Sequence, residues 1–195
     1  MSNHGGVEIE VKLRLPENLN PIRRKLRETR FHVAKRRTLE TNALFDNPEH
    51  SLRNQGKLIR IRHAGTRSVL TYKGPSTLGS RHKRRPEIEI DLPDPLRFEE
   101  ILRQIGYDTA FRYEKFRTEY STHPNKGTVM LDETPIGNFL EVEGSARWID
   151  RTAKILGFAR EDYITSSYGH LYLNYCRERK IQPGNMLFSK PRRTQ

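Results

Sequence analysis

Charged residues of one sign recur two positions apart along this chain. Acidic pairs occur at Glu8/Glu10, Glu87/Glu89 and Glu141/Glu143, and basic pairs occur at Arg60/Arg62 and Lys115/Arg117. On a β-strand, two such side chains lie on one face, roughly 7 Å apart at about 3.3 Å per residue. Each pair can therefore converge on one ligand. Carboxylates suit a hard divalent cation, and the basic side chains suit phosphate.

The charged faces of these strands could contact either water or a shared interior. A single amphipathic strand usually turns its charged face to water. Here the pairs are separated by sign over several strands, which favours faces that line a shared interior. Because a buried ion without compensation is costly, such an interior needs counter-charges, and phosphates and metal ions would supply them. The pattern predicts an interior with an acidic floor and a basic wall.

The predicted strands place these pairs. In the first strand, over residues 7–15, apolar residues alternate with Glu8, Glu10, Lys12 and Arg14. Further strands are predicted over residues 38–46, 58–62, 68–73, 85–91, 111–120, 128–133 and 139–144. Residues 74–83 contain Gly, Pro and Ser and are predicted to form a loop. Antiparallel strands without a parallel crossover pattern favour a barrel or a sandwich over a doubly wound sheet.

Four helices are predicted beside these strands. One starts at Asn20-Pro21, and a second runs from Asp94-Pro95 to Gly106. The second helix is expected to turn Phe98, Ile101, Leu102 and Ile105 inward. The last two are predicted near residues 146–156, where Trp148 and Ile149 would pack on the strands, and near residues 166–177. We expect one domain over residues 1–178 and a basic, flexible tail over residues 179–195.

Composition limits the class of protein. The formal charge of +12 and the pI near 10 predict attraction to polyanions without identifying one. No stretch approaches the ~20 apolar residues of a membrane span, and the N-terminus lacks the apolar core of a signal peptide, so a cytoplasmic protein is expected. Cys176 is the only cysteine, so it has no internal disulfide partner and is expected to serve packing.

The first strand also carries a family signature. Glu8-Ile9-Glu10-Val11-Lys12 matches the ExExK motif of the CYTH superfamily, also called triphosphate tunnel metalloenzymes. Similar elements follow in order at residues 58–62, 71–74, 85–89, 114–117, 131–132 and 137–143. Ser167-Tyr168 with Leu171 resembles the tyrosine-containing helix of the class IV adenylyl cyclase branch. The resemblance spans about residues 7–173.

This resemblance implies an α+β fold, in which eight antiparallel strands close a barrel and helices pack outside. The triphosphate would lie inside with one or two Mg²⁺ or Mn²⁺ ions. By position, the metal-side acids would be Glu8, Glu10, Asp132, Glu141 and Glu143. The phosphates would be held by Lys12, Arg60, Arg62, Lys73, Arg85, Lys115 and Arg117. Catalysis would depend on Glu8, Glu10, Lys12 and Glu141. For Glu87 and Glu89, a metal contact, an arginine-orienting contact and an edge ion pair all stay open.

Two reactions fit such a tunnel. Attack of a ribose 3′-hydroxyl on the α-phosphorus would make an adenylyl cyclase. Attack of water on the terminal phosphorus would make a triphosphatase acting on tripolyphosphate, thiamine triphosphate or a nucleotide. A polyphosphate- or nucleic-acid-binding protein without turnover is the alternative of another class. Nucleic acid is disfavoured because acidic pairs are interleaved with the basic ones. A membrane partner is not expected, and homodimerisation stays open.

Overall fold

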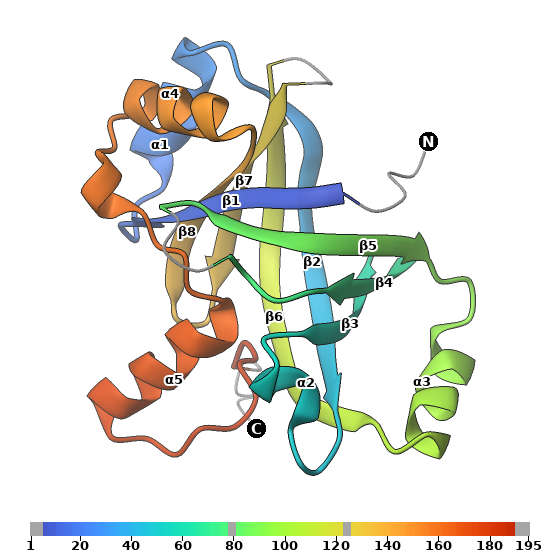
Figure 1. Ribbon diagram of the computed structural model, residues 1–195. Coiled ribbons are helices and arrows are strands. Elements are labelled where there is room, and N and C mark those ends of the chain that lie inside the picture. The colour runs from blue at the N-terminus through green and yellow to red at the C-terminus, as the bar shows by residue number, and fades with distance from the viewer. Residues whose placement is uncertain (1–5, 78–80, 123–125, 190–195) are drawn as a thin grey trace, which may run out of the picture.

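Eight antiparallel strands close into a barrel in the computed structural model, which describes residues 6–77, 81–122 and 126–189 (Figure 1). The strand order around the barrel is β1-β5-β4-β3-β2-β6-β7-β8, and β8 pairs with β1. The strands are β1 (Gly6–Leu15), β2 (His32–Asp46), β3 (Leu58–Ala64), β4 (Arg67–Lys73), β5 (Lys83–Asp91), β6 (Asp108–Ser121), β7 (Gly127–Thr134) and β8 (Gly137–Gly144). The predicted α+β barrel is confirmed.

Helices pack outside this barrel. They are α1 (Asn20–Glu28), α2 (Ser51–Asn54), α3 (Pro95–Gln104), α4 (Ala146–Leu156), α5 (Tyr168–Arg179) and a short 3-10 helix, Arg160–Asp162. Side-chain caps start three of them: Asp94 caps α3, Ser145 caps α4 and Ser167 caps α5. The one-turn α2, which the sequence did not predict, is held by the Asp46 carboxylate. No helix within the described ranges is long and apolar enough to cross a membrane.

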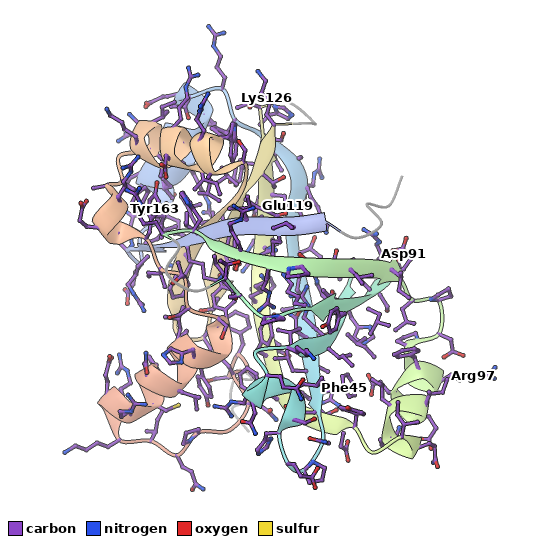
Figure 2. All side chains as sticks on the ribbon, in the orientation of Figure 1. Phe45, Asp91, Arg97, Glu119, Lys126 and Tyr163 are labelled. Atoms are coloured by element: carbon purple, nitrogen blue, oxygen red, sulfur yellow. The ribbon has the colours of Figure 1, made fainter. Side chains whose placement is uncertain are left out.

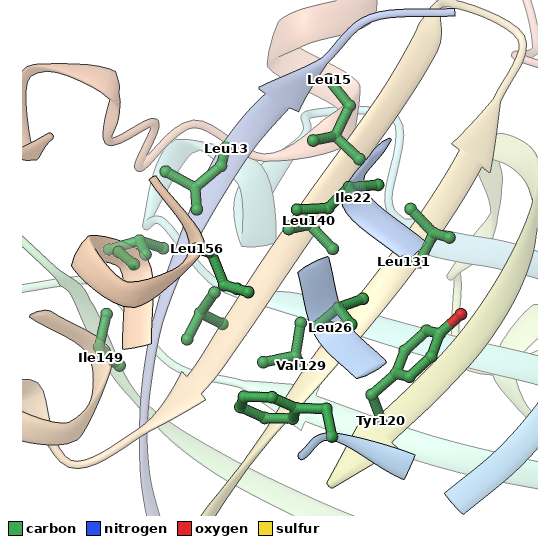
Figure 3. Packing of buried hydrophobic residues seen from close by; sticks show 14 of the residues in the cluster. Leu13, Leu15, Ile22, Leu26, Tyr120, Val129, Leu131, Leu140, Ile149 and Leu156 are labelled. Carbon is green, nitrogen blue, oxygen red and sulfur yellow. The ribbon is translucent and has the colours of Figure 1, made fainter. Parts of the chain in front are cut away.

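The largest apolar core lies on the outer face of β1, β7 and β8, beneath α1 and α4 (Figure 3). It is filled by alternating strand residues and by one stripe of each helix, including Val11, Leu13, Leu26, Val129, Leu140 and Ile149, all fully buried. Burial of each such side chain stabilises the fold by roughly 1.5–3 kcal/mol. With the apolar residues of β1 packed outward, the alternation of the strand turns Glu8, Glu10 and Lys12 into the barrel.

The opposite side of the barrel is covered by α3. Figure 2 shows Arg97 on this helix and Asp91 at the end of β5 on the side of the barrel away from Tyr163. Leu102 is buried against the outer residues of β2 and β3, with Phe98 beside it. The predicted inward positions of Ile101 and Ile105 are wrong, since these side chains are 50% and 63% exposed. A ten-residue helix meets the curved barrel along one line, so only part of its apolar stripe reaches the strands.

One end of the barrel is closed by α5 and the chain that follows it. Tyr168, Tyr113, Phe139 and Met186 form a buried cluster there. The segment after α5 was predicted to be a flexible tail, but its described part, up to residue 189, is docked on β6. Met186 is 1% exposed, and its backbone exchanges hydrogen bonds of 2.9–3.0 Å with β6. Apolar anchors within a basic segment explain the difference. The residues from 190 onward lie outside the described part.

Candidate active site in the barrel interior

The interior of the barrel is a cavity of about 280 Å³ lined by charged side chains from most of the strands. Eight cations line it: Lys12, Arg60, Arg62, Lys73, Lys83, Arg85, Lys115 and Arg117. Seven carboxylates line it as well: Glu8, Glu10, Glu87, Glu89, Glu119, Glu141 and Glu143. All four side chains predicted to be catalytic and all seven predicted to hold phosphate therefore face one space.

The charges of this wall balance one another before any ligand is added. Two further acids, Glu40 and Asp132, are 1% and 0% exposed and lie behind the cations without lining the cavity. The charge of +12 on the chain therefore does not arise from the interior. Phosphates and metal ions were predicted to compensate the interior charges, whereas in the structure the interior cations and carboxylates already compensate one another.

The acids of β1 are held by cations from β1, β4 and β5. Lys73 on β4 lies 2.6 Å from Glu8, and Arg85 on β5 lies 3.8 Å from it. Lys12 and Lys83 contact Glu10 at 3.0 and 2.8 Å. Burial favours a neutral Glu10, but these two lysines outweigh burial and hold the pKa of Glu10 far below its ordinary value. Glu10 is therefore a permanent anion on the cavity wall.

Lys83 is a site residue that the sequence prediction missed. It was assigned to the loop before β5, whereas β5 begins at this residue. Every second residue of β5 points inward, from Glu89 back through Glu87 and Arg85 to Lys83. This alternation was the signal that could have identified Lys83. Burial and the nearby Lys12 lower the pKa of Lys83 to about 8. Lys83 and Arg85 thus both point into the cavity.

Asp132 gathers the cations of β6. Arg117 donates to both of its carboxylate oxygens over 2.6–2.7 Å, Lys115 donates over 2.9 Å, and the Tyr168 hydroxyl donates over 2.7 Å. Arg117 also bonds Glu141, whose second oxygen lies 3.2 Å from Lys12. This arrangement favours a role for Asp132 in orienting cations, and the metal contact predicted for Asp132 stays a prediction.

The acids of β5 contact the arginines of β3, which bears on the question that the sequence left open. Glu89 lies 2.9 Å from Arg62 and 3.3 Å from Arg60, and it accepts a 2.7 Å hydrogen bond from Thr71. Glu87 lies 3.0 Å from Lys73. Both acids face the interior, and these contacts match the orienting role among the three alternatives.

The donor set suits a hard divalent cation that is shared with a phosphate. Glu143 forms no salt bridge within the described ranges, and burial together with the nearby Glu8 raises the pKa of Glu143 to about 7. Crowded carboxylates of this kind are relieved by a cation. No three acidic, histidine or cysteine residues in those ranges are grouped tightly enough to hold an ion by themselves. The residues therefore fit Mg²⁺ or Mn²⁺, which commonly take one or two carboxylates plus substrate phosphates and water.

The lining becomes apolar toward the end closed by α5. On β6, the lining residues Arg117 and Lys115 are followed by Tyr113, and on β2 the lining residue is Leu44. Leu58, Tyr168 and Gly169 complete this end of the cavity. The cavity thus has a charged middle and an apolar, aromatic end.

The model of the CYTH domain matches residues 6–168, which covers all eight strands and the start of α5. The chain belongs to the CYTH family. A protein of Methanocaldococcus jannaschii named as a candidate adenylate cyclase is 26% identical over 150 residues, or 77% of this chain and 83% of the relative. The barrel described above is the triphosphate tunnel of this CYTH family.

Solved structures share the CYTH barrel. A protein from Pyrococcus horikoshii is 26% identical, with a TM-score of 0.69 over 84% of this chain and 98% of its own. A candidate adenylate cyclase from Vibrio parahaemolyticus is 19% identical, with a TM-score of 0.74 over 86% and 98%. A Hippeastrum protein, titled a candidate adenylyl cyclase with a dominant triphosphatase activity, is 19% identical, with a TM-score of 0.61 over 87% and 95%.

Proposed function

We propose that the protein is a divalent-metal-dependent enzyme that binds a triphosphate-containing small molecule in the tunnel and cleaves a P–O–P bond. The observation that carries this proposal is that the tunnel wall bears charges of both signs, since eight cations and seven carboxylates line the same cavity. Cations alone would suffice for a bare polyanion. A wall that also carries carboxylates suits a phosphate chain that arrives together with metal ions.

The cofactor we propose is Mg²⁺ or Mn²⁺, as one or two ions, held by Glu8, Glu10, Glu141 and Glu143. When bound, the metal would supply positive charge that neutralises the negative charge developing on the phosphates in the transition state. The chain itself aligns the phosphates, with cations from five strands: Lys12, Arg60, Arg62, Lys73, Lys83, Arg85, Lys115 and Arg117.

Lys12 supplies fixed positive charge. Its ammonium lies between Glu10 and Glu141, at 3.0 and 3.2 Å. Burial favours the neutral amine, but these two carboxylates raise the pKa of Lys12 above its ordinary value. Lys12 therefore stays protonated and stabilises developing negative charge, and it does not act as a base.

The first candidate reaction is that of a class IV adenylyl cyclase. The ribose 3′-oxygen of ATP attacks the α-phosphorus, the bond from that phosphorus to the β-phosphate oxygen breaks, and pyrophosphate leaves. The proton of the 3′-hydroxyl is released to solvent. The apolar end formed by Leu44, Leu58, Tyr113 and Tyr168 supports an organic triphosphate, because it offers a surface for a nucleoside beside the phosphate site. The name of the Methanocaldococcus relative agrees with this reaction.

The second candidate is a triphosphatase. Water attacks the terminal phosphorus of tripolyphosphate, thiamine triphosphate or a nucleoside triphosphate, and the bond from that phosphorus to the bridging oxygen breaks. The diphosphate leaves, the terminal phosphorus becomes orthophosphate, and the proton of the water is released to solvent. The activity named for the Hippeastrum structure supports this reaction. The same tunnel serves both reactions, because they differ in which phosphorus meets the nucleophile.

A binding protein without turnover is the remaining alternative. It would bind polyphosphate or nucleic acid through the same cations and would form no product. The interleaved carboxylates weigh against it, since they repel an anion that carries no metal.

Product analysis separates these functions. Purified protein is incubated with ATP, with tripolyphosphate and with thiamine triphosphate, each with Mg²⁺ or Mn²⁺. Cyclic AMP with pyrophosphate identifies the cyclase, and orthophosphate identifies the triphosphatase. Absence of any product from all three substrates with both metals would contradict the proposed function.

A further inference from the structure

Glu40 is a buried acid of the tunnel to which neither the family resemblance nor the charge pairs assign a role. It lies on β2 and is 1% exposed. Its backbone neighbour on β6 is Lys115, and Asn42, the next inward residue of β2, pairs with Arg62 of β3. Glu40 therefore stands between the two basic pairs of the wall, Arg60/Arg62 and Lys115/Arg117.

The contacts of Glu40 differ from those of the other interior acids. Its two oxygens lie 3.6 Å from Arg62 and 3.6 Å from Lys115, and neither accepts a hydrogen bond within the described residues. Asp132, by contrast, accepts four. Buried carboxylates normally have hydrogen-bond partners, so this one needs an explanation. Electrostatic attraction to the surrounding cations is what keeps it in place.

That attraction keeps Glu40 ionised. Burial favours the neutral acid, but Lys115, Arg117 and Arg62 outweigh burial and lower the pKa of Glu40 to about 2. The side chain therefore carries a full negative charge at neutral pH. It does not line the cavity, whereas Arg62 and Lys115 do. A phosphate bound by these two cations would meet them from the cavity side while Glu40 holds them from behind.

We propose that Glu40 is a positioning residue that limits the affinity of the basic wall for phosphate, so that a highly charged product can leave. The inference rests on the proposed triphosphate function. Arg62 and Lys115 each have a second acid, Glu89 at 2.9 Å and Asp132 at 2.9 Å, which fixes their orientation independently. Removing the charge of Glu40 therefore leaves both cations in place and makes them more attractive to phosphate.

A purely structural role predicts the opposite effect. If Glu40 only held the strands together, its neutralisation would loosen the wall and weaken binding. The two roles are separated by comparing Glu40→Gln, which removes the charge at equal size, with Glu40→Asp, which keeps the charge on a shorter side chain. Glu133→Gln is the matched control, because Glu133 pairs with Arg37 and Arg23 outside the cavity.

The experiment measures binding of the non-hydrolysable analogue imidotriphosphate, and of pyrophosphate, by calorimetry with Mg²⁺ present. We expect Glu40→Gln to lower both Kd values by at least about tenfold, because a unit charge within about 12 Å of the phosphate, in a medium of effective dielectric about 20, changes the affinity by that factor or more. With a substrate, KM and kcat should both fall, because product leaves more slowly. Glu40→Asp and Glu133→Gln should keep the Kd values of the unmodified protein.

The outcomes distinguish the two proposals. Unchanged or weaker binding by Glu40→Gln overturns the role of Glu40, as does a loss of affinity in Glu40→Asp. If melting curves show that Glu40→Gln is unfolded, Glu40→Asp decides by itself, since retained affinity supports a charge effect and lost affinity contradicts it. If the unmodified protein binds neither probe, the proposed triphosphate function fails and the inference fails with it.

Discussion

The hydroxyl of Tyr168, at the start of α5, donates a 2.7 Å hydrogen bond to the Asp132 carboxylate on β7. The Tyr168 ring also lies 5.3 Å from the Lys12 ammonium and 5.1 Å from that of Lys115. One aromatic side chain thus connects the helix that closes the tunnel to an acid and to two cations of the tunnel wall. Late elements of the chain are in this way coupled to the proposed phosphate site.

Replacing Tyr168 with phenylalanine tests this link. The ring and its contacts with Lys12 and Lys115 are kept, and only the hydroxyl is lost. A buried carboxylate that loses one of its four hydrogen bonds costs about 1–3 kcal/mol, which lowers the melting temperature by roughly 2–12 °C for a chain of this size. Thermal denaturation measures the shift. Tyr172→Phe, whose hydroxyl bonds the exposed backbone of Asn185, is the control and should change the melting temperature less.

Asp132→Asn tests whether Asp132 orients cations or binds metal. The change leaves Arg117 and Lys115 without their common buried acid, which typically costs about 3–5 kcal/mol. We expect this loss of stability in metal-free buffer, as measured by urea denaturation. A variant with unchanged metal-free stability and a selectively weakened Mg²⁺ affinity would instead support the metal role predicted from the family pattern.

Glu10→Gln tests the proposed metal site. Glutamine keeps the size of the side chain but removes the charged oxygen donor, so metal-dependent turnover should fall at least about 100-fold. Glu8→Gln and Glu141→Gln should behave alike while circular dichroism shows an intact fold. Asp91→Asn serves as the control, because Asp91 pairs with exposed Arg67 outside the tunnel. Full activity in all three tunnel variants would overturn the proposed site.

The sequence predicted the walls of the tunnel from strand parity. Glu8, Glu10 and Lys12 alternate with core residues, and the core on the outer face of β1 leaves no other direction for these charges. Glu40 obeys the same rule on β2 but was missed. Its neighbours on that face are Thr38 and Asn42, so no second charge marked the position as part of a pair.

The alternation along a strand predicts the direction of a side chain, whereas tertiary contacts determine how deeply it is buried. Asp132 was correctly expected to point inward, yet its distance from the cavity depends on Arg117, Lys115 and Tyr168 filling the space in front of it. Docking of Met186 on β6 likewise depends on its buried contacts with Tyr113, Phe139 and Tyr168, which no local pattern reveals. Local periodicity therefore fixes the direction of a side chain, while its depth is set by neighbours distant in sequence.

Acid titration provides a further test of Glu40. Its folded-state pKa, about 2, lies below the ordinary value of 4.5, so ionised Glu40 stabilises the fold above pH 4.5 and loses this contribution as pH falls toward 2. The contribution is about 3 kcal/mol from the pKa difference. Unfolding free energies of the unmodified protein should therefore fall more steeply between pH 4.5 and 2 than those of Glu40→Gln. Equal slopes would show that Glu40 is not held ionised by the wall.

Metal removal tests the charge balance of the tunnel. Eight cations face seven lining acids, with Glu40 and Asp132 behind them, so the wall offers a bare polyanion little net attraction. A chelator should therefore weaken imidotriphosphate binding at least about tenfold, and Mg²⁺ or Mn²⁺ should restore it. The metal-bound complex should also depend only weakly on salt, because few counterions are released when a nearly neutral ligand enters a balanced wall. Tight, steeply salt-dependent binding in the presence of chelator would instead indicate a polyanion site formed by the cations alone, and the carboxylates would then have no part in holding the ligand.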